Sequence, residues 1–318
     1  MAAAQTRGKG HASSPAPHPS APRGVRWSPG VGSAIFPPMH TARTRLLAVI
    51  GNPIEHSFSP MIHGTALEQA GLDFTYVAFR VEDAAGAVAS MRALGLRGFS
   101  VTIPHKEAII PHLDRLDASV ERCRSCNTVV NDDGVLTGYS TDGPGAVRAL
   151  TSAGCNPRER DVLVVGSGGV ARAVAFALVD AGVRSLRFRA VEPLQAAALV
   201  ADLNQARAGV VVDLEPNAHE RVQLLVNASP VGMHPAVDQL PVPEAWLRTD
   251  LPVFDVVYNP LTTRLLALAR ARGALTVDGV GMFAEQAALQ FELFTGQEAP
   301  RDLMHRTVRE ALERAAAR

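Results

Sequence analysis

The sequence predicts an α/β protein with room for two domains, the second of them a doubly wound parallel sheet. Three observations support this fold class. Short apolar runs alternate with helix-length segments from residue 45 onward, as is typical of α/β proteins. An uninterrupted apolar strand over residues 161–165 opens a second series of the same kind. The length of 318 residues, with 47% hydrophobic residues, is sufficient for two cores.

The charge balance and the hydropathy pattern exclude two classes of partner. The 31 basic and 31 acidic residues give a formal net charge of zero, so we expect neither a nucleic-acid nor an anionic-membrane partner. No apolar run approaches the roughly 18 to 20 residues that a membrane helix needs. We expect a cytoplasmic protein with a small-molecule partner. No interface signature stands out in the sequence, so a monomer and a homodimer both stay open.

The first 40 residues differ from the rest of the chain. They are rich in Pro, Ala, Ser, Gly and Arg, and no acidic residue occurs before Glu55. Such a segment has too little periodic apolar surface to offset the entropy of ordering it. We interpret residues 1–40 as a disordered or non-native N-terminal extension, with an organellar transit peptide as the alternative. Met39 lies shortly before the first expected strand. This favours the interpretation that residues 1–38 lie upstream of the true start of the protein.

The first unit, up to about residue 143, is expected to alternate strands and helices. Pro60 is suited to the first turn of a helix, and Asp133-Gly134 to the turn of a β-hairpin. The expected elements are strands over residues 46–51, 75–81 and 98–104, helices over 59–71 and 83–94, the hairpin, and a helix from residue 145.

The second unit repeats the alternation with shorter strands, which indicates a doubly wound sheet. The expected strands cover residues 161–165, 186–190, 210–214, 224–228, 253–257 and 275–278, and a helix is expected over 170–181. Amphipathic helices are expected over residues 283–294 and from residue 303 to the C-terminus.

A glycine-rich loop follows the first strand of the second unit and matches G-x-G-x-x-G/A. Its first glycine permits a tight turn, its second lets the backbone approach a pyrophosphate, and the following helix supplies free N–H donors. Since the flanking strand and helix are both expected, the loop predicts dinucleotide binding, with S-adenosylmethionine or no ligand as the alternatives. The candidate cofactor-binding residues are Gly166, Ser167, Gly168, Gly169, Val170 and Ala171.

The residues after the next strand bear on the choice of cofactor. An acid at this position binds a ribose 2′-hydroxyl of NAD, whereas an arginine accommodates the 2′-phosphate of NADP. Glu192 is such an acid and favours NAD, while Arg189 could serve NADP.

Two serines lie at a strand-to-helix turn in the first unit. Ser57 and Ser59 are spaced to place two hydroxyls on one side of an extended segment, where they can bind a carboxylate. The alternative is that Ser59 only caps the following helix.

A lysine and an aspartate in the first unit are candidates for proton transfer. Lys106 closely follows the strand that contains Thr102, and Asp142 lies in a turn-rich stretch at the expected domain junction. A Lys–Asp pair can exchange a proton with a hydroxyl whose carbon is losing a hydride. Asn127 adds a side-chain amide at the start of a strand, where satisfying local backbone groups is the alternative role.

The three cysteines predict no metal site. Cys123 and Cys126 form a single C-x-x-C, and no second pair of ligands with zinc-site spacing accompanies them. We interpret them, with Cys155, as reduced structural thiols.

Together these motifs resemble those of the shikimate dehydrogenase family from about residue 46 to residue 296. Because many motifs occur in the family's order, the resemblance is specific. The matching positions are Ser57 and Ser59, residues 98–106, Asn127-Thr128, Thr141-Asp142, residues 166–173 and 227–233, Tyr258, Gly279 and Gln286.

The resemblance implies a reversible oxidation of shikimate to 3-dehydroshikimate with NADP, in aromatic amino-acid and chorismate biosynthesis, with Lys106 and Asp142 as catalytic residues. It implies two domains around a cleft: an N-terminal α/β substrate domain of residues 44–143 and 283–318, and a Rossmann-type doubly wound cofactor domain of residues 144–282. The implied substrate-binding residues are Ser57, Ser59, Thr102, Asn127, Tyr258 and Gln286, and Gly279 is implied to contact the cofactor.

Several positions depart from the family pattern. Ser100 and Ser140 stand where the family has asparagine, and His105 where it has phenylalanine. Val191 occupies the position of the arginine that clamps the NADP 2′-phosphate, and Gln195 that of the next basic residue. NAD is therefore the alternative cofactor, and a quinate or related polyol acid the alternative substrate. A non-catalytic cofactor-binding regulator is a third possibility, disfavoured because the proton-transfer pair is retained.

Overall fold

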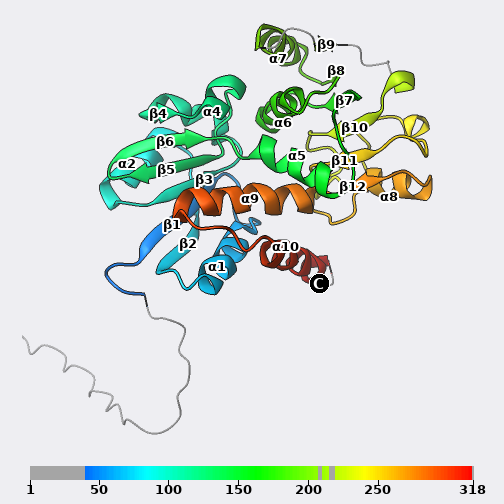
Figure 1. Cartoon of the computed structure of the whole chain (residues 1–318). Coiled ribbons are helices and arrows are strands. Elements are labelled where there is room, and N and C mark those ends of the chain that lie inside the picture. Colours follow the sequence, from blue (N-terminus) through cyan, green and yellow to red (C-terminus); the bar gives the residue numbers. More distant parts are fainter. Residues whose placement is uncertain (1–39, 207–209, 215–218, 317–318) are drawn as a thin grey trace, which may run out of the picture. The chain divides into compact units, whose positions relative to one another are not determined.

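The structure is a computed structural model and describes residues 40–206, 210–214 and 219–316 (Figure 1). The predicted N-terminal extension over residues 1–40 lies outside these residues, except for residue 40. Within the described ranges, no helix combines the length and the apolar character needed to cross a membrane.

The first sheet contains six strands of the described chain, in the order β2-β1-β3-β5-β6-β4. They are β1 (Arg45–Gly51), β2 (Phe74–Arg80), β3 (Gly98–Val101), β4 (Arg115–Leu116), β5 (Thr128–Asp132) and β6 (Val135–Tyr139). β1 is parallel to β2 and β3, whereas β5 is antiparallel to β3 and β6. The predicted hairpin between β5 and β6 is confirmed, and its turn residues Asp133 and Gly134 have φ values of 51° and 93°.

The second sheet has six strands among the described residues, in the order β12-β11-β10-β7-β8-β9, and every pairing is parallel. The strands are β7 (Asp161–Val165), β8 (Ser185–Arg189), β9 (Val211–Asp213), β10 (Leu224–Asn227), β11 (Val253–Asp255) and β12 (Thr276–Val277). From β7 the chain winds outward to β9, then returns to β10 and winds the other way. The order reverses between β7 and β10, the point where doubly wound sheets bind ligands. The predicted doubly wound fold is confirmed.

Helices connect the strands as expected (Figure 1). They are α1 (Ser59–Gln69), α2 (Ala84–Leu94), α3 (His105–Ala108), α4 (Ala118–Cys123), α5 (Asp142–Ser152), α6 (Gly169–Asp180), α7 (Pro193–Ala206), α8 (Arg264–Ala271), α9 (Gly279–Thr295) and α10 (Arg301–Ala316). Compared with the prediction, α5 begins earlier, at Asp142, and α9 begins at Gly279, where the carboxylate of Asp278 caps the helix by accepting from the N–H of Gly281. Both starts place an acid where the helix dipole favours one. The strand predicted over residues 98–104 ends at Val101, and α3, α4 and β4 are too short to leave a periodic signal.

Alternate residues of β1 serve two different cores. Leu47 and Val49 belong to a cluster that includes residues of α1, α9 and α10. Ala48 and Ile50 belong to a cluster on the opposite face that includes residues of α2. The period of two along the strand explains this division, and it explains why the strand is apolar throughout.

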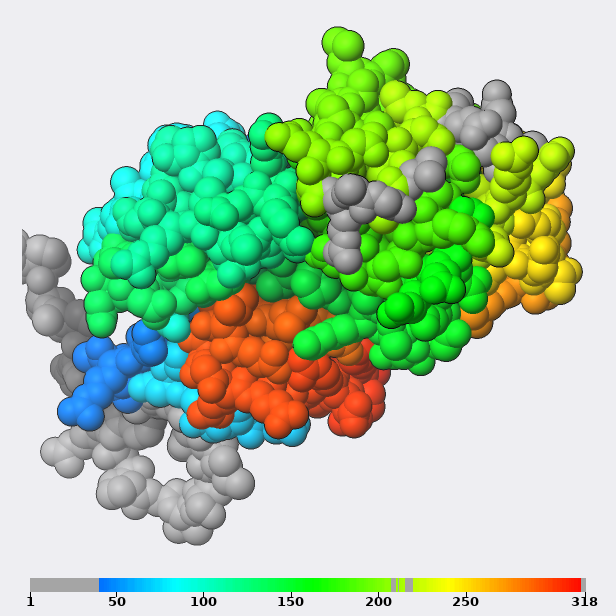
Figure 2. All heavy atoms as spheres, turned by 45° about the horizontal axis from the view of Figure 1, so that its top comes forward, coloured from blue at the N-terminus to red at the C-terminus, as the bar shows by residue number. Residues whose placement is uncertain are grey.

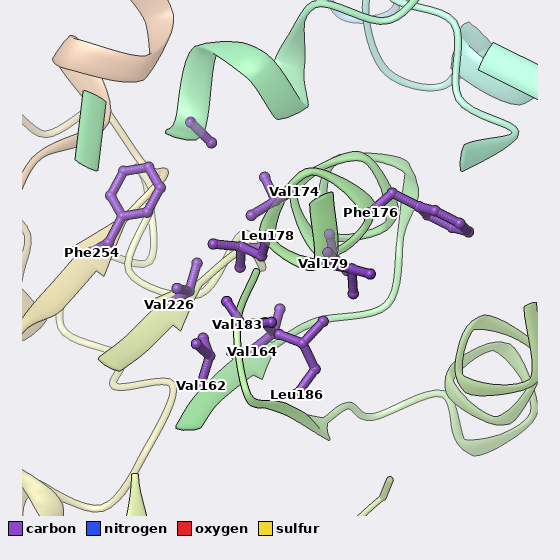
Figure 3. Packing of buried hydrophobic residues seen from close by; sticks show 14 of the residues in the cluster. Val162, Val164, Val174, Phe176, Leu178, Val179, Val183, Leu186, Val226 and Phe254 are labelled. Atoms are coloured by element: carbon purple, nitrogen blue, oxygen red, sulfur yellow. The ribbon is translucent and has the colours of Figure 1, made fainter. Parts of the chain in front are cut away.

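The second sheet is covered on both faces in the same way. Figure 3 shows Leu178 of α6 facing Val164 of β7 and Val226 of β10, in a cluster that fills one face. Leu163, the neighbour of Val164 in β7, instead packs in a cluster with Leu266 of α8. The carboxyl ends of β7 and β10 are thereby held between two rigid layers.

Helices α5 and α9 pack against each other and lie between the two sheets (Figure 1). Gly145 of α5 makes this close approach possible, since a Cβ there would lie 2.9 Å from the backbone nitrogen of Gln286 in α9. On the outer side α9 reaches the surface beside α10, as Figure 2 shows in orange and red. The start of α5 is therefore close to Gln286 in α9, and the start of α9 is close to Ala149 in α5.

His63 is a fully buried histidine in α1. Its ring stacks on that of Tyr76 at a centroid distance of 4.4 Å, and neither ring nitrogen has a hydrogen-bond partner among the described residues. Burial lowers the pKa of His63 from 6.5 to about 4, although the nearby Gln290 side chain partly opposes this shift. Folding therefore favours the neutral imidazole, and its contribution to stability is complete above pH 6.5 and is lost as the pH falls towards 4.

We expect His63→Phe to remove this pH dependence while keeping the ring stack. Between pH 7 and pH 4, the free energy of unfolding of the variant should rise by about 3 kcal/mol relative to that of wild type. The reason is that the variant lacks the histidine whose pKa falls from 6.5 to about 4 on folding. Urea unfolding at several pH values measures the difference. The buried Asp255, whose pKa burial raises to about 6, titrates in both proteins and cancels from it. A difference that does not change with pH would contradict the prediction.

Candidate active site

The two residues predicted to exchange a proton lie in direct contact. Lys106 is in α3, just after β3, and Asp142 is the first residue of α5. The Lys106 Nζ lies 2.5 Å from Asp142 Oδ2, and the two side chains are only 13% and 7% exposed. The N–H of Cys126 donates to the carbonyl of Lys106 at 2.8 Å and ties α3 to the chain before β5. Because this ion pair is almost fully buried, removing either partner would leave the other as an uncompensated buried charge.

Asn127 joins this pair from the start of β5. Its Nδ2 donates to Asp142 Oδ1 at 2.9 Å and to Thr141 Oγ1 at 2.8 Å, while its Oδ1 accepts from the backbone N–H of Thr141 at 2.8 Å. These partners are 14 and 15 residues away, so the alternative that Asn127 serves only local backbone groups is wrong. The two carboxylate oxygens of Asp142 thus have different partners, Asn127 on one and Lys106 on the other.

The serine pair lies at the start of α1. The residue that caps this helix is Phe58, and it makes no side-chain cap hydrogen bond, so the alternative that Ser59 only caps the helix is wrong. The backbone N–H of Ser59 donates to Ser57 Oγ at 3.3 Å. Burial raises the pKa of Tyr76, and hydrogen bonds with Ser100 and Ser59 partly oppose that shift.

Thr102 follows β3 and is half-buried beside Gly51 at the end of β1. A Cβ on Gly51 would lie 2.5 Å from the Thr102 methyl group, so this position requires the absence of a side chain. The carbonyl of Thr102 accepts from the N–H of His105 at 2.9 Å, and the ring of His105 contacts the Val81 carbonyl through Nε2 at 2.7 Å. The turn that carries Lys106 is therefore fixed from both ends.

Gln286 of α9 and Tyr258, which follows β11, approach the same region. The Gln286 side chain accepts from Asn127 Nδ2 at 3.4 Å and donates to the Phe283 carbonyl at 2.9 Å. Tyr258 stacks on Phe283 at 4.6 Å and meets Phe58 edge-on at 6.5 Å. Since Phe58 lies between the two serines, these rings connect the serine pair with the start of α9.

The glycine-rich loop has the form that a dinucleotide phosphate needs. Gly166 has φ +112°, and a Cβ there would lie 2.8 Å from the carbonyl oxygen of Ala228. No side chain caps the N-terminus of α6, so its first N–H groups are available to a phosphate. A Cβ at Gly168 would meet no atom within 4 Å, which leaves open space above the loop. The predicted loop residues therefore fit a nicotinamide dinucleotide.

A second loop, after β10, borders the first at the point where the sheet order reverses. Asp255 holds this loop in place, and it was not among the residues predicted from the sequence. Asp255 accepts from Asn227 Nδ2 at 2.9 Å and from Thr263 Oγ1 at 2.6 Å, and Asn227 Oδ1 in turn accepts from the Ser229 hydroxyl at 2.6 Å. Gly279 lies next to β11, since a Cβ there would lie 2.5 Å from the Val256 carbonyl oxygen.

The residues expected to choose the cofactor follow β8. Val191 is 92% exposed, and Glu192 beside it is also exposed. The Gln195 side chain accepts from the hydroxyl of Ser167, in the glycine-rich loop, at 2.8 Å. The Arg189 guanidinium lies over the Trp246 ring at 5.4 Å from its centroid. The arginine closest to this position in the sequence is therefore engaged with a ring.

The three cysteines are buried free thiols. Burial raises the pKa of Cys126 to about 12 and also raises that of Cys123, so both thiols resist ionisation. Among the described residues, no group of three or more His, Cys, Asp and Glu side chains could hold a metal ion.

The sequence analysis missed a buried polar side chain in α9. Gln290 lies one helical turn after Gln286, donates to the Asn127 carbonyl at 2.9 Å and accepts from the Ser100 hydroxyl at 2.8 Å. A glutamine on the otherwise apolar face of an amphipathic helix was a signal that could have identified it.

Comparison with known proteins supports one family. A family model described as the shikimate dehydrogenase substrate binding domain matches residues 49–129, and one described as the shikimate 5'-dehydrogenase C-terminal domain matches residues 279–309. A protein of Moorella thermoacetica named shikimate dehydrogenase (NADP(+)) is 44% identical over 279 residues, which are 85% of this chain and 95% of that protein.

Two solved structures are similar over nearly their whole length. A shikimate dehydrogenase in complex with NADP+ is 34% identical, with a TM-score of 0.82, over 86% of this chain and 98% of the other. A shikimate 5-dehydrogenase of Listeria monocytogenes in complex with shikimate and NAD is 35% identical, with a TM-score of 0.79, over 87% of this chain and 99% of the other.

Proposed function

The chain belongs to the shikimate dehydrogenase family, and we propose that it catalyses the reversible, NAD(P)-dependent oxidation of shikimate to 3-dehydroshikimate in aromatic amino-acid and chorismate biosynthesis. The observation that carries this proposal is the contact between Lys106 Nζ and Asp142 Oδ2 at 2.5 Å, beside the free N-terminus of α6. Both parts of an alcohol dehydrogenation, a proton acceptor and a dinucleotide cradle, are thereby present.

The proton of the reacting hydroxyl passes to the Lys106–Asp142 pair. When bound, NAD(P) supplies the acceptor for the hydride that leaves the same carbon. Asp142 holds the Lys106 amine at the reacting oxygen through Oδ2, and Asn127 holds Asp142 through Oδ1. In the reverse direction the pair returns the proton to the carbonyl oxygen.

The remaining predicted residues bind the substrate in this proposal. Ser57 and Ser59 bind the carboxylate with their hydroxyls, since they are adjacent at the start of α1. Thr102, Asn127 and Gln286 bind ring hydroxyls, and Tyr258 adds a further contact. The cofactor residues are the loop from Gly166 to Ala171, Glu192 and Gly279. Support for these roles comes from the hydrogen bonds and ring contacts that join α1, β5 and α9.

We also propose the domain division and setting expected from the sequence. Residues 44–143 and 283–318 form the substrate domain, and residues 144–282 form the cofactor domain. The protein is cytoplasmic, a monomer or a homodimer, and binds neither nucleic acid nor membrane.

A spectrophotometric assay tests the proposed function. Purified protein is mixed with shikimate or quinate and with NAD+ or NADP+, and formation of the reduced nicotinamide is followed. We expect turnover with shikimate, whereas a higher kcat/KM for quinate would favour the related polyol-acid dehydrogenase. Absence of nicotinamide reduction in all four combinations would overturn the proposal, and cofactor binding without turnover would indicate the regulator.

Cofactor choice gives a separate prediction. NADP is the cofactor named for the relative of Moorella thermoacetica, but Val191 offers no charge to a 2′-phosphate, and the neighbouring Glu192 repels one. We expect Val191→Arg to raise the ratio of kcat/KM for NADP to that for NAD by roughly 10- to 100-fold, the effect of a new charge-assisted contact. Steady-state kinetics with both cofactors measures the ratio.

Leu94→Arg is the matched control for this prediction. It adds the same charge at an aliphatic residue that is 75% exposed, in α2 of the first unit. We expect it to leave the cofactor ratio unchanged. If both substitutions change the ratio equally, net charge and not a 2′-phosphate contact at position 191 accounts for the effect.

A further inference from the structure

A continuous series of buried hydrogen bonds runs from the first sheet towards the proton-transfer pair. The Tyr76 hydroxyl of β2 donates to Ser100 Oγ of β3 at 2.6 Å, and Ser100 donates to Gln290 Oε1 at 2.8 Å. Gln290, on α9, is 2% exposed. Its Nε2 donates to the Asn127 carbonyl at 2.9 Å and to Thr128 Oγ1 at 3.0 Å. The series therefore crosses from β2 through β3 and α9 to β5.

The direction of these bonds fixes the orientation of Asn127 together with the backbone N–H of Thr141, which also donates to Asn127 Oδ1, at 2.8 Å. A hydroxyl has one hydrogen to donate, and Thr128 donates it to Asn127 Oδ1 at 2.9 Å while accepting from Gln290. The Oδ1 end of the Asn127 amide is thereby directed at Thr128, and its Nδ2 end is directed at Asp142 Oδ1. Asp142 then presents its other oxygen to Lys106.

We propose that Gln290 is a positioning residue that acts on the reaction through Asn127, although it touches neither Lys106 nor Asp142. This inference rests on the proposed function, since it assigns a consequence for turnover. Hydrogen bonds fix both ends of the Gln290 amide, because its oxygen accepts from the Ser100 hydroxyl and its nitrogen donates to the Asn127 carbonyl. Tyr76, held by its stack on His63, completes the support for Ser100.

The alternative is that Gln290 only stabilises the fold. Asn131 provides the matched control, because it is a buried amide on the same strand, β5. It donates to the Leu96 carbonyl at 3.0 Å and accepts from the Gly134 N–H at 2.8 Å, and neither bond leads to Asn127. Gln290→Leu and Asn131→Leu both remove a buried amide with backbone partners, but only the first interrupts the series.

We expect Gln290→Leu to lower kcat for shikimate oxidation by roughly 10- to 100-fold, as small misplacements of catalytic groups do. The dissociation constant of the cofactor should not change, because the glycine-rich loop is untouched. Asn131→Leu should lower the melting temperature without lowering kcat. Ser100→Ala is a smaller truncation, which keeps Gln290 but removes the hydroxyl that donates to its oxygen. We expect it to lower kcat by roughly 2- to 10-fold. Equal kcat values for Gln290→Leu and Asn131→Leu would overturn the proposal. If Gln290→Leu does not fold, an unchanged kcat in Ser100→Ala would overturn it instead.

A measurement without substrate separates this proposal from the proposed function. Protein labelled with ¹⁵N-asparagine gives side-chain amide signals, and the Asn127 signal is identified by its loss in Asn127→Asp. We expect the Asn127 amide hydrogens to exchange with solvent faster in Gln290→Leu and in Ser100→Ala than in Asn131→Leu. If wild type oxidises no polyol acid but the exchange changes as expected, the proposed function fails and the positioning by Gln290 stands. Unchanged exchange in both variants overturns the positioning whatever the activity.

Discussion

Lys106→Ala is expected to keep the fold and to lower kcat by several orders of magnitude, within the 10²- to 10⁴-fold or more that positioned acid–base groups contribute. The side chain lies in the short helix α3, and its amine contacts Asp142. In the proposed mechanism, truncation removes the amine that exchanges the proton of the reacting hydroxyl, while Asn127 still holds the carboxylate of Asp142. In the part of the chain that the structure describes, the side-chain hydrogen bond of Lys106 goes to Asp142 and not to the glycine-rich loop, so cofactor affinity should be retained.

The composition of the chain adds a sharper comparison at the same position. Of its 31 basic residues, only Lys9 and Lys106 are lysines, and the others are arginines. A site that needed only a positive charge could use arginine, as the rest of the chain does. An amine can lose its proton, whereas a guanidinium keeps its proton in proteins. We therefore expect Lys106→Arg, which preserves the charge, to be nearly as inactive as Lys106→Ala.

Steady-state kinetics distinguishes the possible roles of Lys106. Circular dichroism and cofactor titration are the controls for folding. A loss in kcat with both substitutions supports proton transfer. An increase in KM alone would make Lys106 a binding residue. Recovery of kcat by Lys106→Arg would show that charge suffices and would contradict the assignment.

Much of the fold and of the site was predictable because the signals are local. The strand β7, the glycine-rich loop and α6 are consecutive in the chain, and the apolar run of β7 shows that both faces of its sheet are covered. The turn at Asp133-Gly134 requires residues that tolerate positive φ, and the sequence supplies them. The pairing of Lys106 with Asp142 was predicted from their residue types and their places in the chain, and the family resemblance supported it. No local pattern requires it, since 35 residues separate them along the chain.

The parts that were not predictable depend on contacts distant in sequence. Gln290 meets Asn127 across 163 residues, and Asp255 meets Asn227 across 28. Neither residue type indicates such a partner by itself. The order of the first sheet, in which β4 lies beside β6 at the edge, also follows from tertiary packing and not from any short pattern.

Asp142→Asn is the second substitution expected to have a large effect. It conserves the shape of the side chain and an oxygen that can accept from Asn127 Nδ2, but it places an amide where Oδ2 now contacts Lys106. The amine loses its counter-charge and its acceptor, so kcat should fall on the order of 10²- to 10⁴-fold. Asp83→Asn, which changes only the cap of α2, is the control and should remain fully active.

The double variant Lys106→Ala/Asp142→Asn tests whether the two residues act as one unit. Residues that act independently multiply their losses in kcat, whereas members of one catalytic unit do not, because removing either already removes the function of both. The 2.5 Å contact predicts the second behaviour, with the double variant about as slow as the slower single variant. Single-turnover measurements with saturating cofactor keep the comparison on the chemical step. A double variant slower by the product of both single losses would mean that Asp142 contributes to catalysis without Lys106.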